Sequence, residues 1–193
     1  MPSFEAKAGV VLLAAGQGKR FDGNKLTADF RGRPLWESAA QTAENVDLGE
    51  RVLVVGPNSA ISSRPGWRWV ENPDAEKGMG TSIAAGVRAL TDCDRVLVML
   101  SDMPLVSGAH LGRLIAAQGV AFTRYSDGTA GCPAIFPRSV FPLLESLTDD
   151  RGARSLHLAD AELIEPDCDR ELSDVDTARD LERLHSTRRR PKG

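Results

Sequence analysis

The chain contains few of the residues that build metal centres and disulfide frameworks. It has 3 cysteines and 3 histidines in 193 residues. Cys93, Cys132 and Cys168 lie far apart and form no CxxC spacing, so we expect reduced thiols rather than a zinc site or a disulfide framework. The histidines are equally isolated, and no Ser/His/Asp or Cys/His arrangement follows from their spacing.

The chain also lacks an excess of charge of one sign and any long apolar run. Its 24 basic and 27 acidic side chains give a net charge of -3, so no basic field favours nucleic acid. No apolar run approaches the roughly 18–20 residues that cross a bilayer. Residues 1–8 lack the apolar core of a signal peptide. These absences predict a cytoplasmic protein with neither a membrane nor a nucleic-acid partner.

The hydrophobic content of 41% is enough for one substantial core. We expect a single domain over residues 1–185 and a disordered basic tail over residues 186–193. The tail holds four cations and no apolar residue to anchor it, and a nucleic-acid role for those cations is the alternative.

The most informative stretch is residues 11–25, where an apolar run ends in small residues and a glycine-rich loop follows. The apolar run indicates a buried strand. The loop carries Lys19, Arg20 and Lys25 among glycines that allow tight turns and expose backbone N–H groups. Amides and fixed cations together suit an oligophosphate. The alternative is an ordinary polar loop with scattered basic residues.

Two better-known phosphate loops do not fit these residues. A Walker loop needs lysine directly after its second glycine, but Asn24 follows Gly23. A dinucleotide fingerprint needs glycine at its first, third and sixth positions. Gly16 and Gly18 supply two of these, and Phe21 occupies the third.

Strand-like apolar runs alternate with helical patterns along the chain. Expected strands cover residues 10–14, 51–55, 95–100, 120–125 and 134–136, and expected helices include residues 36–46 and 177–185. Apolar residues also recur at helical spacing around residues 83–90, 111–115 and 141–147. This alternation predicts a mostly parallel sheet covered by helices on both faces.

Five segments resemble the nucleotidyltransferases and, within them, the molybdenum cofactor cytidylyltransferases. They are residues 13–25 (Leu-Ala-Ala-Gly, then Arg-Phe and a lysine), 78–83, 101–104, 131–136 and 174–177. The resemblance extends over nearly the full length. It implies a three-layer α/β/α sandwich with a mainly parallel sheet, Rossmann-like and similar to the nucleotide-diphospho-sugar transferases.

The resemblance also implies a nucleotide site. Arg20, Lys25 and Asp102 would be catalytic, and Arg20 and Lys25 would stabilise the β- and γ-phosphates. The implied nucleotide-binding residues are Leu13, Ala14, Ala15, Gly16, Gly18, Arg20, Lys25, Gly80, Ser82 and Asp102. Residues 78–82 are expected to open a helix whose free N–H groups face the nucleotide. The alternative for Ser82 is a helix cap.

A magnesium ion is expected at Asp102, because this carboxylate follows an expected strand and would lie beside a triphosphate. The alternative is that Asp102 caps a nearby helix, although Ser107 could provide that cap instead. The resemblance implies that a segment near the C-terminus folds back to the nucleotide and supplies a second carboxylate to the metal. We assign this role to Asp174 first and to Asp176 second. Asp176 could instead cap the final helix.

Residues 148–154 resemble the acceptor-side segment of the cytidylyltransferases at Asp150 and Arg154, although Asp149 replaces a glycine. Arg154 could hold an acceptor phosphate through two parallel hydrogen bonds. The alternative is ordinary surface pairing between these arginines and aspartates.

The implied reaction is Mg²⁺-dependent transfer of CMP from CTP to a molybdopterin-type phosphate with release of pyrophosphate. We expect a monomer whose further partner is a molybdoenzyme or its chaperone. CTP is favoured because cytidylyl members have Ala15, whereas guanylyl members have glycine there. The alternatives are guanylyl transfer, nucleotidyl transfer to a sugar phosphate, and a non-catalytic molybdenum cofactor-binding chaperone.

Overall fold

The computed structural model describes residues 7–16, 18, 21, 23–150, 152–156, 158 and 160–186. One seven-stranded sheet has the order β3-β2-β1-β4-β6-β5-β7. The strands are β1 (Ala8–Ala14), β2 (Arg51–Val55), β3 (Arg68–Glu71), β4 (Arg95–Leu100), β5 (Ala121–Arg124), β6 (Ala130–Pro137) and β7 (Glu162–Ile164). The α-helices are α1 (Leu35–Glu44), α2 (Met79–Arg88), α3 (Gly108–Ala116), α4 (Phe141–Glu145) and α5 (Ala178–Ser186).

The sheet is mainly parallel, as the alternation of elements predicts. Strand β1 pairs in parallel with β2 and β4, β2 with β3, and β5 with β7. Strand β6 is antiparallel to both β4 and β5. Because the strand order reverses at β1, loops that follow β1, β2 and β4 meet at one end of the sheet, where open α/β sheets bind ligands.

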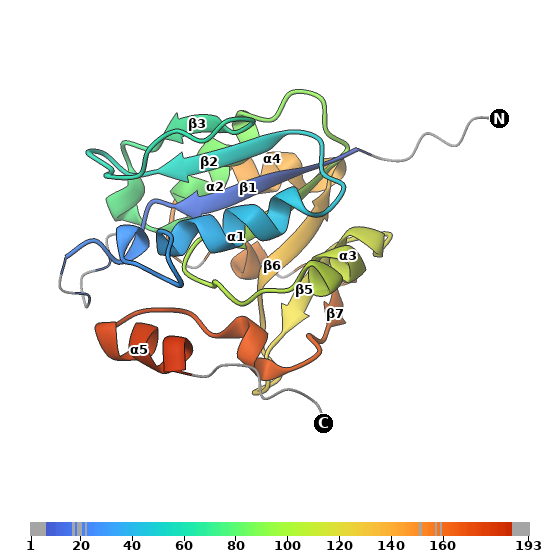
Figure 1. Cartoon of the computed structure of the whole chain (residues 1–193). Coiled ribbons are helices and arrows are strands. Elements are labelled where there is room, and N and C mark those ends of the chain that lie inside the picture. Colours follow the sequence, from blue (N-terminus) through green and yellow to red (C-terminus); the bar gives the residue numbers. More distant parts are fainter. Residues whose placement is uncertain are drawn as a thin grey trace.

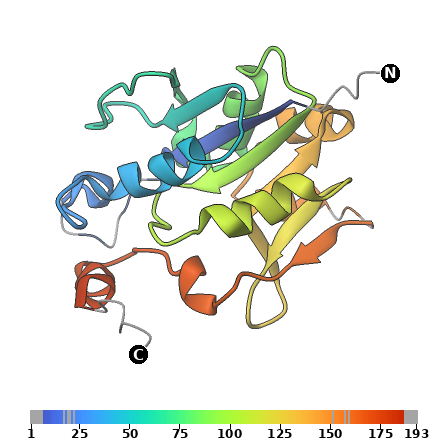
Figure 2. The same ribbon diagram turned by 45° about the vertical axis from the view of Figure 1, so that its right-hand side comes forward.

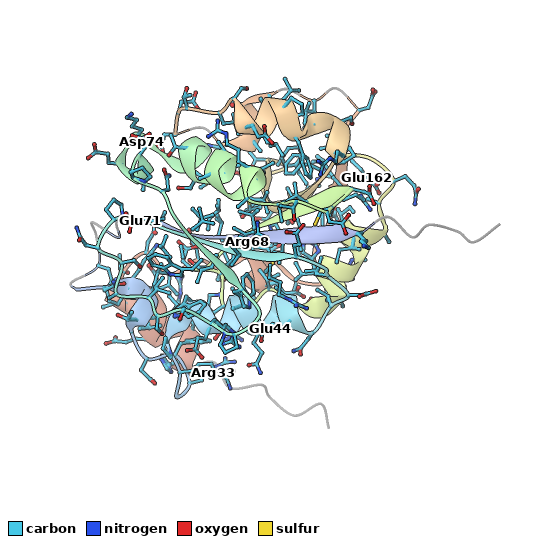
Figure 3. The ribbon with its side chains drawn as sticks, turned by 90° about the horizontal axis from the view of Figure 1, so that it is seen from above. Arg33, Glu44, Arg68, Glu71, Asp74 and Glu162 are labelled. Carbon is cyan, nitrogen blue, oxygen red and sulfur yellow. The ribbon has the colours of Figure 1, made fainter. Side chains whose placement is uncertain are left out.

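Alternate residues of β1 belong to two separate cores. Val10 and Leu12 pack in the cluster that includes residues of α1 and α3, whereas Val11 and Leu13 pack with residues of α2 and α4. Figures 1 and 2 show α1 and α3 on one face of the sheet, and Figure 3 shows α2 and α4 on the opposite side from α1. The three-layer α/β/α sandwich is therefore confirmed.

Two strands were not predicted from the sequence, and both lie at the sheet edges. The residues of β3 are exposed apart from the half-buried Val70, and β7 has three residues with no buried side chain. Edge strands with this little burial lack the apolar run that indicates a strand. The prediction for β6 was too short, because its first half reads Ala-Gly-Cys-Pro.

Three local predictions about helix ends can be compared with the structure. Ser107 does cap α3, since its side chain accepts a hydrogen bond from the His110 amide. Thr177, not Asp176, caps α5: its hydroxyl accepts from the Asp180 amide (3.2 Å), and its own amide donates to Asp180 (2.9 Å). Ser82 is not a cap either, because Gly78 occupies that position of α2.

No helix in the described part of the chain is both long and apolar enough to cross a membrane. The expected basic tail at residues 186–193 falls outside the described residues except for Ser186, the last residue of α5. Cys93, Cys132 and Cys168 are free thiols.

Candidate functional site

Two adjoining pockets lie at the carboxyl end of the parallel strands, with cavity volumes of about 420 and 580 Å³. The larger pocket contains Asp102, Asp176, Ser82 and Asp150 in its lining. The smaller pocket is lined by the glycine-rich loop and by residues that follow β2. Residues shared by both linings are Ala15, Gly16, Gly18, Lys25, Leu26, Ala75 and Glu76. The pockets therefore form one cleft around the end of β1.

Asp102 is held at this cleft by the residue before it. Ser101 is buried, and both its amide (3.1 Å) and its hydroxyl (2.7 Å) donate to the carbonyl of Leu13. These two hydrogen bonds join the end of β4 to the end of β1. Asp102 Oδ2 accepts from Lys25 Nζ at 2.7 Å. Within the described residues, Oδ1 of Asp102 is buried and has no hydrogen-bond partner.

Lys25 is 7% exposed, which is unusual for a lysine, and its ammonium reaches two carboxylates. Nζ lies 2.7 Å from Asp102 Oδ2 and 3.4 Å from Asp176 Oδ1. Burial acts to lower the pKa of Lys25, but the charges of Asp102 and Asp176 outweigh it and raise that pKa above its ordinary value. Lys25 is therefore a fixed positive charge in the cleft.

The glycine-rich loop packs against the Lys25 side chain at Gly18. Gly18 has φ +54°, a conformation that glycine adopts at low cost, and a Cβ at this position would lie 3.4 Å from Lys25 Cγ. Asn24 accepts a hydrogen bond from the Leu26 amide and so caps the short 3₁₀ helix η1 (Lys25–Thr27). Both features direct Lys25 into the cleft.

The C-terminal segment returns to Asp102, as the resemblance implies. The Val175 amide donates to the Asp102 carbonyl at 3.0 Å, and the Val175 side chain is fully buried. Asp176 lines the larger pocket, whereas Asp174 is exposed and does not line either pocket. Partial desolvation, followed by the charges of Asp176 and Asp102, raises the pKa of Asp174. The geometry therefore places Asp176 nearer the cleft than Asp174.

The described residues contain no group of three or more His, Cys, Asp and Glu side chains arranged to hold a metal ion. The unpartnered Oδ1 of Asp102 nevertheless offers a buried anionic oxygen at the cleft. Magnesium is bound through one or two carboxylates together with substrate phosphates and water. Asp102 and one neighbouring carboxylate therefore fit a hard divalent cation that a bound nucleotide helps to hold.

The N-terminus of α2 forms part of the wall of the larger pocket, with Gly78, Met79 and Ser82 in its lining. Gly78 has φ +128°, and a Cβ there would lie 2.5 Å from Asp150 Cα. Gly80 lines neither pocket, and its amide donates to the Asp149 carbonyl at 2.8 Å. These glycines thus let the loop that carries Asp149 and Asp150 pack directly against α2.

The structure brings most of the sequence-predicted site residues together. Leu13, Ala14, Ala15, Gly16, Gly18, Lys25, Ser82, Asp102, Asp150 and Asp176 line one or both pockets. Arg154 lies in the 3₁₀ helix η4 (Ala153–Leu156), is exposed, and lines neither pocket. Arg20 falls outside the described residues.

Sequence reasoning missed the part of the cleft that follows β2 and β3. Gly56, Pro57, Asn58 and Ser59 line the smaller pocket with Pro73, Ala75 and Glu76. Figure 3 labels Glu71, the last residue of β3, and Asp74 beyond it at this same end of the sheet. Gly56-Pro57 directly after a predicted buried strand is the signal that could have placed the first group at the cleft.

Comparison with known proteins gives the same type of domain. A family model described as MobA-like NTP transferase domain matches residues 10–163. The chain is 32% identical to the purine catabolism protein PucB of Bacillus subtilis, over 86% of this chain and 90% of that protein. It is 34% identical to the nicotine blue oxidoreductase of Paenarthrobacter nicotinovorans, over 90% of this chain and 94% of that protein.

Solved structures have the same fold. Rv0371c from Mycobacterium tuberculosis superposes with a TM-score of 0.79 at 27% identity, covering 94% of this chain and 99% of Rv0371c. A second structure of that protein, a complex with manganese, has a TM-score of 0.75 at 26% identity over 94% of this chain and 99% of that chain. The fold is that of the nucleotide-diphospho-sugar transferases, as expected from the resemblance.

Proposed function

Because the chain belongs to the MobA-like NTP transferase family, we propose that it transfers CMP from CTP to a molybdopterin-type phosphate. The observation that carries the proposal is the arrangement of Lys25 and Asp102 in the cleft. A buried ammonium lies there beside a carboxylate, one oxygen of which has no partner among the described residues. The phosphates of a nucleotide would pair with the ammonium, and the cation bound to those phosphates would pair with the carboxylate.

In this proposal the acceptor phosphate attacks the α-phosphorus of CTP in line, the bond to the bridging β-phosphate oxygen breaks, and pyrophosphate leaves. Positioning and charge stabilisation supply most of the acceleration of such transfers. Lys25 binds the β- and γ-phosphate oxygens and stabilises the charge of the leaving pyrophosphate. Arg20 and the amides of the glycine-rich loop complete the phosphate clamp.

Asp102, with Asp176 or Asp174, would hold a divalent cation. When bound, the cation supplies positive charge to the phosphates and fixes their orientation. The manganese complex of Rv0371c supports a divalent cation in this fold, and we propose Mg²⁺ for this chain. Ser101 contributes by holding the backbone at Asp102 against Leu13.

Ala15 supports CTP as the donor. It is 8% exposed and lines both pockets, so its methyl group narrows the cleft at the end of β1. For the acceptor, we propose that Asp150 and Arg154 contact the molybdopterin-type phosphate. Asp150 lines the larger pocket, and Arg154 lies four residues later in the 3₁₀ helix η4.

The test is to incubate the protein with Mg²⁺, each of the four NTPs in turn and candidate acceptors, and to measure pyrophosphate. We expect pyrophosphate only when an acceptor is present, fastest with CTP and a molybdopterin-type phosphate. Faster release with GTP would favour guanylyl transfer. Pyrophosphate release with CTP and a sugar phosphate would show that the acceptor is a sugar phosphate and not a molybdopterin-type phosphate. No release with any pair, despite tight binding of the cofactor, would favour a non-catalytic chaperone.

A further inference from the structure

The C-terminal strap, which we define as residues 173–186, runs from Asp102 to the turn that follows Lys25. Near its start, the Val175 amide donates to the Asp102 carbonyl at 3.0 Å. Its second half is α5, which begins at Ala178. Figures 1 and 2 show α5, in red, below the blue segment that follows β1. The strap therefore contacts both segments that supply the Lys25–Asp102 pair.

Asp176 lies in the strap between two fixed neighbours. On one side, Val175 is bonded to the end of β4 and its side chain is fully buried. On the other side, the amide (2.9 Å) and the hydroxyl (2.7 Å) of Thr177 both donate to Asp180 Oδ2 in the first turn of α5. Asp176 Oδ1 lies 3.4 Å from Lys25 Nζ. Because no spare residue separates these neighbours, the position of Asp176 depends on where α5 docks.

The last turn of α5 docks on the turn at residues 29–31, soon after η1. His185 Nε2 donates to the Asp29 carbonyl at 3.0 Å, and the ring centroids of His185 and Phe30 are 5.2 Å apart. The Arg31 guanidinium donates to the Leu184 carbonyl at 3.4 Å. The Leu184 side chain is 3% exposed and packs in the same core as Phe30. The buried part of this docking contact is therefore centred on Leu184.

Helix α5 needs this contact to stay in place. It has nine residues, and isolated helices shorter than about 12–15 residues are only marginally stable in water. Peripheral elements with few buried contacts open at a lower free energy than the core does. A change that loosens α5 can therefore move Asp176 while the sheet and the rest of the cleft stay folded.

We propose that the docking of α5 on residues 29–31 places Asp176 as the second carboxylate for the cation of the bound nucleotide, with Leu184 as the positioning residue. This inference rests on the proposed function, in which Asp176 or Asp174 joins Asp102 at that cation. The coupling acts in both directions, as any linkage between two equilibria does. A docked strap strengthens binding of the nucleotide with its cation, and the bound cation keeps the strap docked.

The first test is Leu184→Ala, which weakens docking without changing a charge. Calorimetry without acceptor gives the Kd for CTP once with excess Mg²⁺ and once with EDTA, and the ratio is the factor by which Mg²⁺ tightens CTP binding. We expect this Mg²⁺ factor to fall roughly tenfold in the variant, because apparent affinity falls with the fraction of molecules in the binding-competent state.

Leu90→Ala is the matched control for general destabilisation. Leu90 packs in the other core, near Gly9 at the start of β1 and so away from the cleft. The control removes the same group, and its Mg²⁺ factor should stay within about twofold of the wild type, as for independent distant sites.

A double variant tests whether Leu184 acts through Asp176. Asp176→Asn alone should lower the Mg²⁺ factor, and adding Leu184→Ala should lower it little further, because both changes remove the same carboxylate from the cation. If the two effects on the factor simply multiplied, Leu184 would act independently of Asp176, and that result would overturn the positioning role.

Amide hydrogen exchange gives a readout that depends on neither affinity nor turnover. In the wild type, CTP with Mg²⁺ should slow exchange in residues 178–186 more than CTP with EDTA does, since the cation keeps the strap docked. This Mg²⁺-dependent protection should be absent from Asp176→Asn. Equal protection of α5 in that variant and in the wild type would contradict the inference.

The outcomes distinguish this inference from the proposed function. A wild type that binds no NTP overturns both. A wild type that binds GTP in place of CTP ends the cytidylyl proposal alone, because the strap acts on phosphate and cation, and the same measurements are then made with GTP. A folded Leu184→Ala variant with an unchanged Mg²⁺ factor overturns the inference alone.

If Leu184→Ala does not fold, His185→Ala decides, because it removes only the bond to the Asp29 carbonyl and the ring contact with Phe30. His185→Ala should lower the Mg²⁺ factor in the same direction, and an unchanged factor overturns the role of the strap.

Discussion

The ammonium of Lys25 pairs with one oxygen of the Asp102 carboxylate, with Nζ 2.7 Å from Oδ2, while Oδ1 of Asp102 has no partner in the described residues. In the proposed function Lys25 binds phosphate and Asp102 binds a cation, so the proposal implies that nucleotide binding and cation binding are coupled through this pair.

Asp102→Asn should keep the fold but reduce turnover by about 10²-fold or more, as expected for the loss of a preorganised charge interaction. Turnover and thermal melting of the purified variant provide the measurement. Unchanged melting together with nearly wild-type turnover would contradict a metal or catalytic role for Asp102.

Lys25→Met removes the ammonium but keeps an unbranched side chain. NTP use should weaken without any change in the ranking of the four bases, because phosphates carry no base identity. Binding of Mn²⁺ without nucleotide should become tighter, since Asp102 no longer has a competing cation. Titration followed by electron paramagnetic resonance measures this. A looser Mn²⁺ site in the variant would show that Lys25 supports cation binding.

Asp174→Asn and Asp176→Asn should have unequal effects. Asp176 lines the larger pocket and contacts Lys25, whereas Asp174 does neither, so we expect the larger loss of turnover from Asp176→Asn. The dependence of the rate on Mg²⁺ concentration should shift to higher concentration in the more affected variant. A greater shift of the Mg²⁺ dependence in Asp174→Asn would instead support Asp174 as the metal ligand, which is the residue that the sequence analysis prefers.

Ala15→Gly should narrow the preference for CTP over GTP without reversing it. One methyl group in a pocket is worth roughly 1–3 kcal/mol, or about 10- to 200-fold in discrimination. Competition between labelled CTP and GTP at equal concentration is the measurement. A wild-type preference for GTP would end the cytidylyl proposal and leave the family assignment unchanged.

Glu50 should make the stability depend on acid pH. Burial acts to raise its pKa, but hydrogen bonds from the Asp92 and Thr91 amides, and others, outweigh it and lower the pKa to about 2. Its contribution is therefore complete above its unfolded pKa, near 4.5, and is lost as the pH falls toward about 2. Glu50→Gln should destabilise by about 1–3 kcal/mol at pH 7.

Denaturant unfolding from pH 7 to pH 2 measures this effect. The gap in free energy of unfolding between wild type and Glu50→Gln should shrink below pH 4.5. The exposed Glu71→Gln provides a matched control with little effect on stability. A gap that stays constant down to pH 2 would contradict the role of the charge.

The sequence by itself determined the sheet type, the buried central strands and the end of the sheet that carries the site. Short apolar runs rich in β-branched residues favour strands, and the predictions for β2 and β4 match the observed bounds. Residues adjacent in the chain, such as Ala15 and Gly16, could be placed together because a single loop joins them. The site residues drawn from the family resemblance were largely brought together by the fold.

Only the tertiary structure decided relations between distant segments. The Val175 amide bonds to the Asp102 carbonyl, and this contact brings Asp176 to Lys25. Asn72 donates to Ser82 from another loop, and neither segment alone predicts that hydrogen bond. Thr177 takes the cap that Asp176 could also have filled. Hydrogen-bond direction and burial depend on which groups meet in space, and local spacing carries no information about that.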